Sequence, residues 1–196
     1  ISQGYTLPKV IENYQKRFSV SYPNEELRAA RPLRTTPMYD IFDSMGAVWG
    51  AQYGLEVANY FAQGDEPRYE TPSFRRSNAF EATRREVMAV RDSVGINETH
   101  NFGKYRIAGG NARTWLNKIM AGRIPPNGRL SLTPMLSPKG RLIGDFTVSC
   151  LSETEFQLTA SYGGQAYHMR WFLQNQSASV EIENISDRLT GFQITG

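Results

Sequence analysis

The sequence contains very few of the residues that build disulfides and metal centres. Of its 196 residues, one is a cysteine (Cys150) and two are histidines (His100 and His168), which lie far apart. A single cysteine excludes a disulfide framework within the chain, and no cysteine–histidine spacing typical of a zinc site occurs. Two isolated histidines also leave little material for a Ser-His-Asp triad. The cysteine content fits a reducing compartment.

Long apolar runs and long basic stripes are missing too. No apolar stretch approaches the roughly 20 residues that span a bilayer, so no membrane partner is expected. The net charge is only +3, and its densest arginine pairs, Arg75-Arg76 and Arg84-Arg85, belong to no nucleic-acid motif. We therefore expect no nucleic-acid partner. At 40% hydrophobic residues, the chain can bury the core of one large domain, or of one domain with a smaller attachment.

Residues 1–58 differ in character from the rest of the chain. "LPKVIENYQKRF" predicts a short helix with Pro8 in its first turn, and "TTPMYDIFDSMG" predicts a second helix with Thr36 at the N-cap. "AVWGAQYG" predicts a short strand or an irregular segment. The stretch between the two helices is rich in proline, arginine and polar residues. Such a segment forms a poor core of its own, so we expect it to pack against something else.

From about residue 59 onward the pattern becomes regular. Helices are predicted near residues 78–95, 110–122 and 163–175, and strands near residues 102–109, 130–136, 141–150, 154–161, 179–186 and 191–196. The tight turn at Ser137–Gly140 predicts that the strands near 130–136, 141–150 and 154–161 are adjacent and antiparallel. Hairpin connections of this kind predict an α+β fold, with a mainly antiparallel sheet and flanking helices, instead of a parallel doubly wound sheet.

Asp145 is an unusual residue for the middle of a strand, where β-propensity disfavours aspartate. Strand alternation places Leu142, Phe146 and Val148 on one apolar face, and Ile143, Asp145, Thr147 and Ser149 on the other. The following strand repeats this division, so Asp145 belongs to a largely polar sheet face. That face is either open to water or the floor of a polar pocket. In a pocket, an ionised aspartate would accept hydrogen bonds from a ligand's N–H groups or take up a proton.

Two long stretches resemble a known family. "PSFRRSNAFEATRREVMAVRDSVGINETHNFGKYRIAG", followed by "LTPMLSPKGRLIGDFTV", resembles the folate-binding half of dimethylglycine and sarcosine dehydrogenases, a domain that stands alone as the glycine-cleavage T-protein, an aminomethyltransferase. The upstream "ENYQKRFSVSYPNEELRAARPLRTTPMYD" is similar to the segment that joins their flavin domain to the folate domain. The resemblance implies a connector over residues 1–58 and the N-terminal part of a truncated T-protein-like domain over residues 59–196.

The resemblance also implies cofactors and site residues. A flavin domain that uses FAD, absent from this sequence, would oxidise an N-methyl group, and the T-protein-like domain would capture the one-carbon unit on tetrahydrofolate as 5,10-methylenetetrahydrofolate. Asp145 matches the family's acidic residue beside folate N10, whereas the preceding position, often a second acid, is Gly144 here. Leu132 matches a position that touches the pterin or its linker. Ser161 matches a polar position that hydrogen-bonds the pterin.

Three functions stay open on the sequence. The first is a fragment of a flavin-dependent N-methylglycine dehydrogenase or oxidase, whose isolated part would not oxidise amines. The second is a stand-alone aminomethyltransferase or a folate-dependent demethylase, and the third is a non-catalytic folate-binding or interaction module. The chain opens at Ile1 and closes in a strand-like run, which favours a piece of a longer polypeptide. The expected partners are folate and the remaining domains of that polypeptide, in a bacterial cytoplasm or a mitochondrial matrix.

Overall fold

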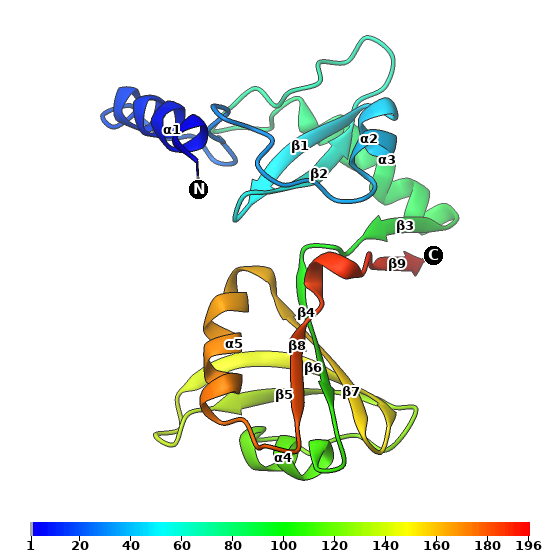
Figure 1. The fold of residues 1–196 in the computed structure, drawn as a ribbon. Helices are drawn as coiled ribbons and strands as arrows, with labels where there is room; N and C mark the ends of the chain where they lie inside the picture. Colours follow the sequence, from blue (N-terminus) through cyan, green and yellow to red (C-terminus); the bar gives the residue numbers. More distant parts are fainter. Residues whose placement is uncertain (1) are drawn as a thin grey trace. The chain divides into compact units, whose positions relative to one another are not determined.

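The structure, a computed structural model, describes residues 2–196 and divides into two compact units (Figure 1). Unit 1 contains the described residues up to Glu98 together with Phe192–Gly196. Unit 2 contains Thr99–Gly191. Within residues 2–196, no helix is both long enough and apolar enough to cross a membrane.

Unit 1 combines short helices with two small antiparallel sheets. Strands β1 and β2 form a hairpin, and β3 pairs with β9 from the far end of the chain. Its buried apolar cluster is small and consists of Val48, Tyr60, Ala62 and Ala82. The elements are α1 (Gln3–Gln15), α2 (Tyr39–Ser44), β1 (Ala47–Gln52), β2 (Leu55–Phe61), α3 (Ala79–Asp92), β3 (Gly95–Glu98) and β9 (Phe192–Thr195).

Both expected helices of the N-terminal region form, with different beginnings. Helix α1 begins at Gln3, so Pro8 lies inside the helix and not in its first turn, which removes one backbone hydrogen bond. Helix α2 begins at Tyr39 after Met38, and the prediction of Thr36 as its N-cap is wrong. The Thr36 hydroxyl instead donates to the Glu98 carboxylate at 3.1 Å. This partner is distant in the chain, so local capping rules give no sign of it.

Unit 2 is built on one five-stranded antiparallel sheet in the order β5-β6-β7-β4-β8. The three central predictions are confirmed, because β5, β6 and β7 are adjacent and antiparallel. Strand β4 then pairs with both β7 and β8. The elements are β4 (Phe102–Ala108), α4 (Ala112–Ile119), β5 (Leu130–Leu136), β6 (Leu142–Ser152), β7 (Glu155–Ser161), η1 (Tyr162–Gly164), α5 (Gln165–Gln174), β8 (Glu181–Asn184) and η2 (Ser186–Arg188).

One face of this sheet forms the main core. Side chains from β4, β6 and β7, among them Tyr105, Phe146 and Leu158, are buried together with Trp115 of α4 and Phe172 of α5. Figure 1 shows α5 lying across the sheet. The fold is therefore α+β with a mainly antiparallel sheet and flanking helices, as predicted.

A β-bulge in β6 reverses part of the predicted division between its faces. Leu136 pairs with Leu142 and Met135 pairs with Gly144, so Ile143 is an extra residue without a partner on β5. Consequently Leu142 is 58% exposed and Ile143 only 8%, the reverse of the prediction from strict alternation. Beyond the bulge the prediction holds, since Phe146 and Val148 are buried and Asp145 is exposed.

Candidate functional site

The candidate site lies on the face of the unit 2 sheet that points away from the buried core. Pairing aligns Leu132 of β5 with Thr147 of β6, and Thr147 with Thr159 of β7. Asp145 lies two residues along β6 from Thr147, opposite Pro134 of β5. Since alternate residues of a strand share a face, Leu132, Asp145 and Thr159 project on the same side of the sheet.

The carboxylate of Asp145 has no intramolecular partner. The residue is exposed, and within residues 2–196 no hydrogen bond or ion pair involves its side chain. The β6–β7 pairing ends at Thr147 and Thr159, so Asp145 stands just beyond the paired part of the two strands. Its acceptor oxygens are therefore available to a donor from outside the chain.

The apolar part of the site comes from the edge strand β5. Leu132 is 73% exposed, and Leu130, two residues earlier on the same face, is nearly as exposed. Pro134 follows on this face and is tolerated because β5 is an edge strand. The sequence prediction named Leu132 and not Leu130, although the period-two spacing of the two leucines in "RLSLTP" indicates their common face.

Ser161 lies at the other border of this face. It is the last residue of β7, it pairs with Phe102 of β4, and it is exposed. Like Asp145, it lies two residues beyond the end of the β6–β7 pairing. The three predicted residues thus share one exposed face of one sheet, with Ser161 and Asp145 near the same end of it.

A buried histidine explains why the residue before Asp145 is a glycine. His168 of α5 is buried, and its Nδ1 lies 3.0 Å from the Tyr105 hydroxyl oxygen. A Cβ atom on Gly144 would lie 2.6 Å from Nε2 of His168 and 3.0 Å from the Phe146 ring. The imidazole therefore occupies the space in which a side chain at position 144 would begin. A second acid at this position does not fit the packing.

Burial also shifts the pKa values of His168 and Tyr105. Desolvation lowers the pKa of His168 below its usual value of 6.5, partly opposed by a hydrogen bond to the backbone of Ile143. Desolvation likewise raises the pKa of the Tyr105 hydroxyl. A neutral imidazole and a neutral phenol at neutral pH are typical of a structural contact. The surroundings of His168 thus indicate a structural role.

His100 is a buried polar residue of unit 2. It is 4% exposed, and its Nδ1 lies 3.1 Å from the Leu189 carbonyl oxygen. Burial and the nearby Lys104 lower its pKa. Within residues 2–196, no group of three or more His, Cys, Asp or Glu side chains is arranged to hold a metal ion. Cys150 is buried.

Two cavities of about 600 and 580 Å³ lie away from the sheet face with Asp145. The larger belongs to unit 1, where Arg28, Trp49 and Glu70 contribute to its wall. The smaller belongs to unit 2 and is lined by residues that include Lys118 and Trp171. Leu132, Asp145 and Ser161 line neither of these two cavities, and all three residues are exposed.

Comparison with known families gives two matches along the chain. The family described as "GCVT N-terminal domain" matches residues 38–196. The family described as "FAD dependent oxidoreductase central domain" matches residues 2–36. The two matches meet near residue 37, and the residues of the candidate site all fall within the first family.

Individual relatives show the same relationship. The chain is 33% identical to mitochondrial dimethylglycine dehydrogenase of Rattus norvegicus over 98% of its own length and 23% of that protein. It is 22% identical to the mitochondrial pyruvate dehydrogenase phosphatase regulatory subunit of Mus musculus, over 100% of this chain and 23% of that protein. The chain thus spans about a quarter of the length of these relatives.

A solved structure supports the fold. The glycine cleavage system aminomethyltransferase T from Bartonella henselae superposes with a TM-score of 0.64 at 15% identity. The match covers 79% of this chain and 38% of that protein.

Proposed function

The chain belongs to the GCVT N-terminal domain family, and we propose that it is part of a flavin-dependent N-methylglycine (dimethylglycine or sarcosine) dehydrogenase or oxidase. In this proposal residues 59–196 help to bind tetrahydrofolate and to capture a one-carbon unit as 5,10-methylenetetrahydrofolate. Residues 1–58 connect this part to an oxidoreductase domain. The match of residues 2–36 to an oxidoreductase central domain supports the connector. The mitochondrial relatives favour a matrix location over a bacterial cytoplasm.

The exposed and unpartnered carboxylate of Asp145 carries the proposal. An aspartate inside a strand is unfavourable, and no described residue compensates for it. An ionised carboxylate accepts hydrogen bonds only, and it binds N–H donors strongly. The N10 region of a reduced folate offers such a donor. Leu132 and Leu130 supply an apolar surface on the same sheet face for the ligand's planar part or its linker.

The residues present fit a tetrahydrofolate molecule in part. Bound tetrahydrofolate would supply the nitrogen nucleophiles that accept the one-carbon unit. Asp145 would orient the N10 region and hold the proton released there, as a positioned general base does. Ser161 would contribute one hydroxyl, which can donate one hydrogen bond and accept others. Gly144 cannot contribute a second acid because His168 fills its space, so the proton-accepting role falls to Asp145 alone.

The amine oxidation belongs to FAD in the proposed oxidoreductase domain. Side chains do not supply this redox chemistry by themselves. The glycine-rich "IAGGNAR" lacks the spacing of a dinucleotide fingerprint, so we assign no flavin contact to any residue from 2 to 196.

The test is Asp145→Asn in the whole polypeptide. The change keeps the shape of the side chain but removes its charge and its capacity to accept a proton. Formation of 5,10-methylenetetrahydrofolate should fall on the order of 10²-fold, while flavin reduction by the substrate stays nearly unchanged. Released formaldehyde should rise, because the uncaptured oxidation product hydrolyses.

The matched control is Asp65→Asn, which makes the same chemical change at an exposed turn residue of unit 1. It should alter neither product. Full folate coupling in Asp145→Asn would show that Asp145 is only a solvated surface residue, and the catalytic proposal would then be wrong.

The relationship to a phosphatase regulatory subunit supports a second candidate, a non-catalytic folate-binding or interaction module. The single acid of the site is consistent with it, because little catalytic machinery remains. The two candidates differ in one measurement. A module binds tetrahydrofolate without forming 5,10-methylenetetrahydrofolate when the substrate amine is supplied, whereas the dehydrogenase forms it. The stand-alone aminomethyltransferase or demethylase differs from the dehydrogenase, because its gene carries no upstream flavin domain.

A further inference from the structure

Helix α1 of unit 1 carries an exposed apolar stripe. Leu7, Val10, Ile11 and Tyr14 follow the i, i+3, i+4, i+7 spacing of one helix face, and their side chains are between 49% and 69% exposed. Phe18, which follows the end of α1, is 91% exposed. We call these five residues the outer stripe. No residue of α1 is buried.

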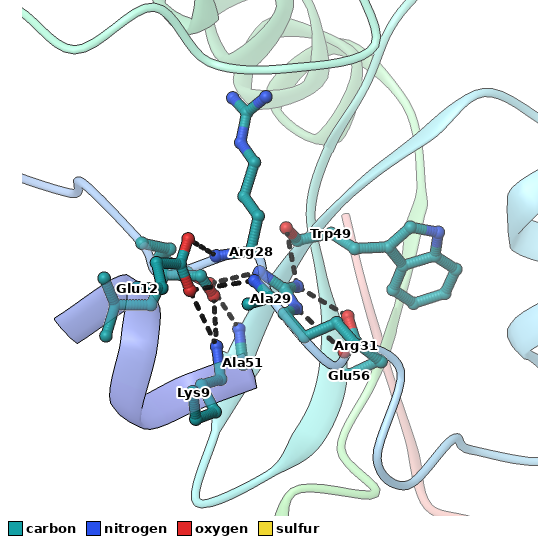
Figure 2. A network of polar contacts seen from close by, with 10 residues as sticks. Lys9, Glu12, Arg28, Ala29, Arg31, Trp49, Ala51 and Glu56 are labelled. Atoms are coloured by element: carbon teal, nitrogen blue, oxygen red, sulfur yellow. Dashed lines mark hydrogen bonds and ion pairs between the residues drawn. The ribbon is translucent and has the colours of Figure 1, made fainter. Parts of the chain in front are cut away.

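The opposite face of α1 is the one that binds the rest of unit 1, and it is polar. The Glu12 carboxylate accepts hydrogen bonds from the backbone N–H groups of Arg28 and Ala29, both at 2.8 Å. The Lys9 ammonium donates to the Leu27 carbonyl at 2.7 Å (Figure 2). One turn later, Lys16 pairs with Glu25 at 2.8 Å. At about 100° per residue, these contacts lie on average about 180° from the outer stripe.

The loop that receives α1 is itself fixed to the β1–β2 hairpin. Arg31 donates to both oxygens of the buried Glu56, to Glu26 at 2.9 Å and to the Trp49 carbonyl at 3.0 Å (Figure 2). Glu26 also accepts from the backbone N–H of Ala51 at 2.8 Å. The polar network therefore holds α1 at a defined place on unit 1 with its apolar stripe outward.

This orientation is the reverse of an ordinary surface helix. An amphipathic helix normally turns its apolar face to its own core and its polar face to water. A helix with the opposite orientation leaves a continuous apolar surface exposed, and such surfaces mark interaction sites. The outer stripe is thus expected to be covered by something other than unit 1.

We propose that the outer stripe is a docking surface for the oxidoreductase domain of the same polypeptide. The occupant is chosen on two observations. Residues 2–36, which contain all of α1, match the central domain of FAD-dependent oxidoreductases, so this helix is related to a part of that domain. The chain also spans only 23% of dimethylglycine dehydrogenase. The inference rests on the proposed function for the presence of that domain, and it adds the surface by which this chain binds it.

The experiment compares hydrogen exchange of the α1 backbone amides in the 196-residue chain and in the whole polypeptide. In the wild-type polypeptide, exchange should be at least about tenfold slower than in the 196-residue chain, because docking suppresses local opening. Val10→Glu should return the exchange in the polypeptide to the rate of the 196-residue chain. Asn13→Glu, which adds the same charge beside the stripe, is the matched control and should leave the protection intact.

Three results would overturn the docking proposal. The first is equal exchange in the polypeptide and in the 196-residue chain. The second is protection of α1 in the 196-residue chain that rises with protein concentration, which would identify a second copy as the occupant. The third is protection in the 196-residue chain that is independent of concentration and lost in Val10→Glu, which would place another part of this chain on the stripe.

Flavin absorbance and methylenetetrahydrofolate formation are measured on the same wild-type polypeptide. If both are present and α1 is unprotected, only the docking proposal fails. If the polypeptide carries no oxidoreductase domain, both the docking proposal and the proposed function fail.

Discussion

The two units are held together by different interactions. Unit 2 has a cluster of seventeen buried apolar residues around one sheet, whereas the corresponding cluster in unit 1 has four. Ion pairs show the opposite distribution. Of eleven ion pairs among the described residues, seven lie in unit 1 and four in unit 2. Most of these pairs are exposed and contribute little, so the buried Arg31–Glu56 pair matters most in unit 1.

This difference affects how each unit supports its exposed surface. The packed core of unit 2 supports a sheet whose outer face carries Asp145, so that site is held by apolar packing behind it. In unit 1, helix α1 directs Lys9 and Glu12 toward the rest of the unit and its apolar side chains outward. Changes to packing should therefore damage unit 2 most, and changes to charge should damage unit 1 most.

Phe146→Ala should produce the largest loss of stability. Phe146 is fully buried in the unit 2 core, where it contacts the rings of Tyr105, His168 and Phe172. The free energy of unfolding of unit 2 should fall by about 3–5 kcal/mol, measured by hydrogen exchange of the β4–β7 amides. Leu142→Ala on the same strand is the control and should cost much less, because the bulge leaves Leu142 exposed. Similar losses in both variants would contradict the bulged register.

Glu56→Gln should be the most damaging single charge change in unit 1. It leaves the half-buried Arg31 guanidinium with only the Glu26 carboxylate. Removing one partner of a buried ion pair lowers the free energy of unfolding by about 3–5 kcal/mol. We expect a loss of about 3 kcal/mol here, because the Glu26 carboxylate still pairs with Arg31. Hydrogen exchange of the β1–β2 amides measures the loss. Glu81→Gln, the same change in an exposed pair of α3, should have almost no effect.

If Glu56→Gln and Glu81→Gln behave alike, the network of Figure 2 does not hold unit 1. The proposed difference, in which apolar packing stabilises unit 2 and a charged network stabilises unit 1, would then be wrong.

Gly144→Ala tests the space that His168 occupies. The new methyl group would lie 2.6 Å from Nε2 of His168, so the imidazole must move. Overpacking of this kind should lower the free energy of unfolding of unit 2 by about 1–3 kcal/mol in urea titrations. Gly110→Ala is the control, because a Cβ there meets nothing within 4 Å. The double variant with His168→Ala should show a favourable coupling energy, and strict additivity would contradict the steric explanation.

The smallest effect expected is a pH dependence of unit 2 stability. Burial lowers the pKa of His168, so below about pH 6.5 the unfolded chain binds a proton that the folded chain does not. The free energy of unfolding should therefore decrease as the pH falls from about 7, by no more than about 1.4 kcal/mol per pH unit for this one group. His168→Gln should reduce the slope between about pH 7 and pH 5. An unchanged slope would assign the dependence to other groups, His100 first among them.

Local patterns predicted much of unit 2. The turn at Ser137–Gly140 and the alternation of the flanking strands gave the β5-β6-β7 meander and the exposed side of Asp145, because these features depend on neighbours in the chain. Strict alternation failed at Leu142 and Ile143, since a bulge depends on the partner strand. The prediction of Thr36 as a helix cap was wrong for a related reason, because the Thr36 hydroxyl binds the carboxylate of Glu98, which is distant in the chain.

The sequence by itself determined the α+β class, the antiparallel meander, the absence of a disulfide framework, and the family to which the chain belongs. It also determined that an aspartate stands in a strand where propensity disfavours one. Only the tertiary structure decided that Gly144 lies against His168, that Leu132, Asp145 and Ser161 share one exposed face, and that α1 turns its apolar side outward. The physical reason is the separation along the chain between the residues that interact. Turns, caps and periodicity act over a few residues, whereas burial and packing are set by residues far apart in the chain.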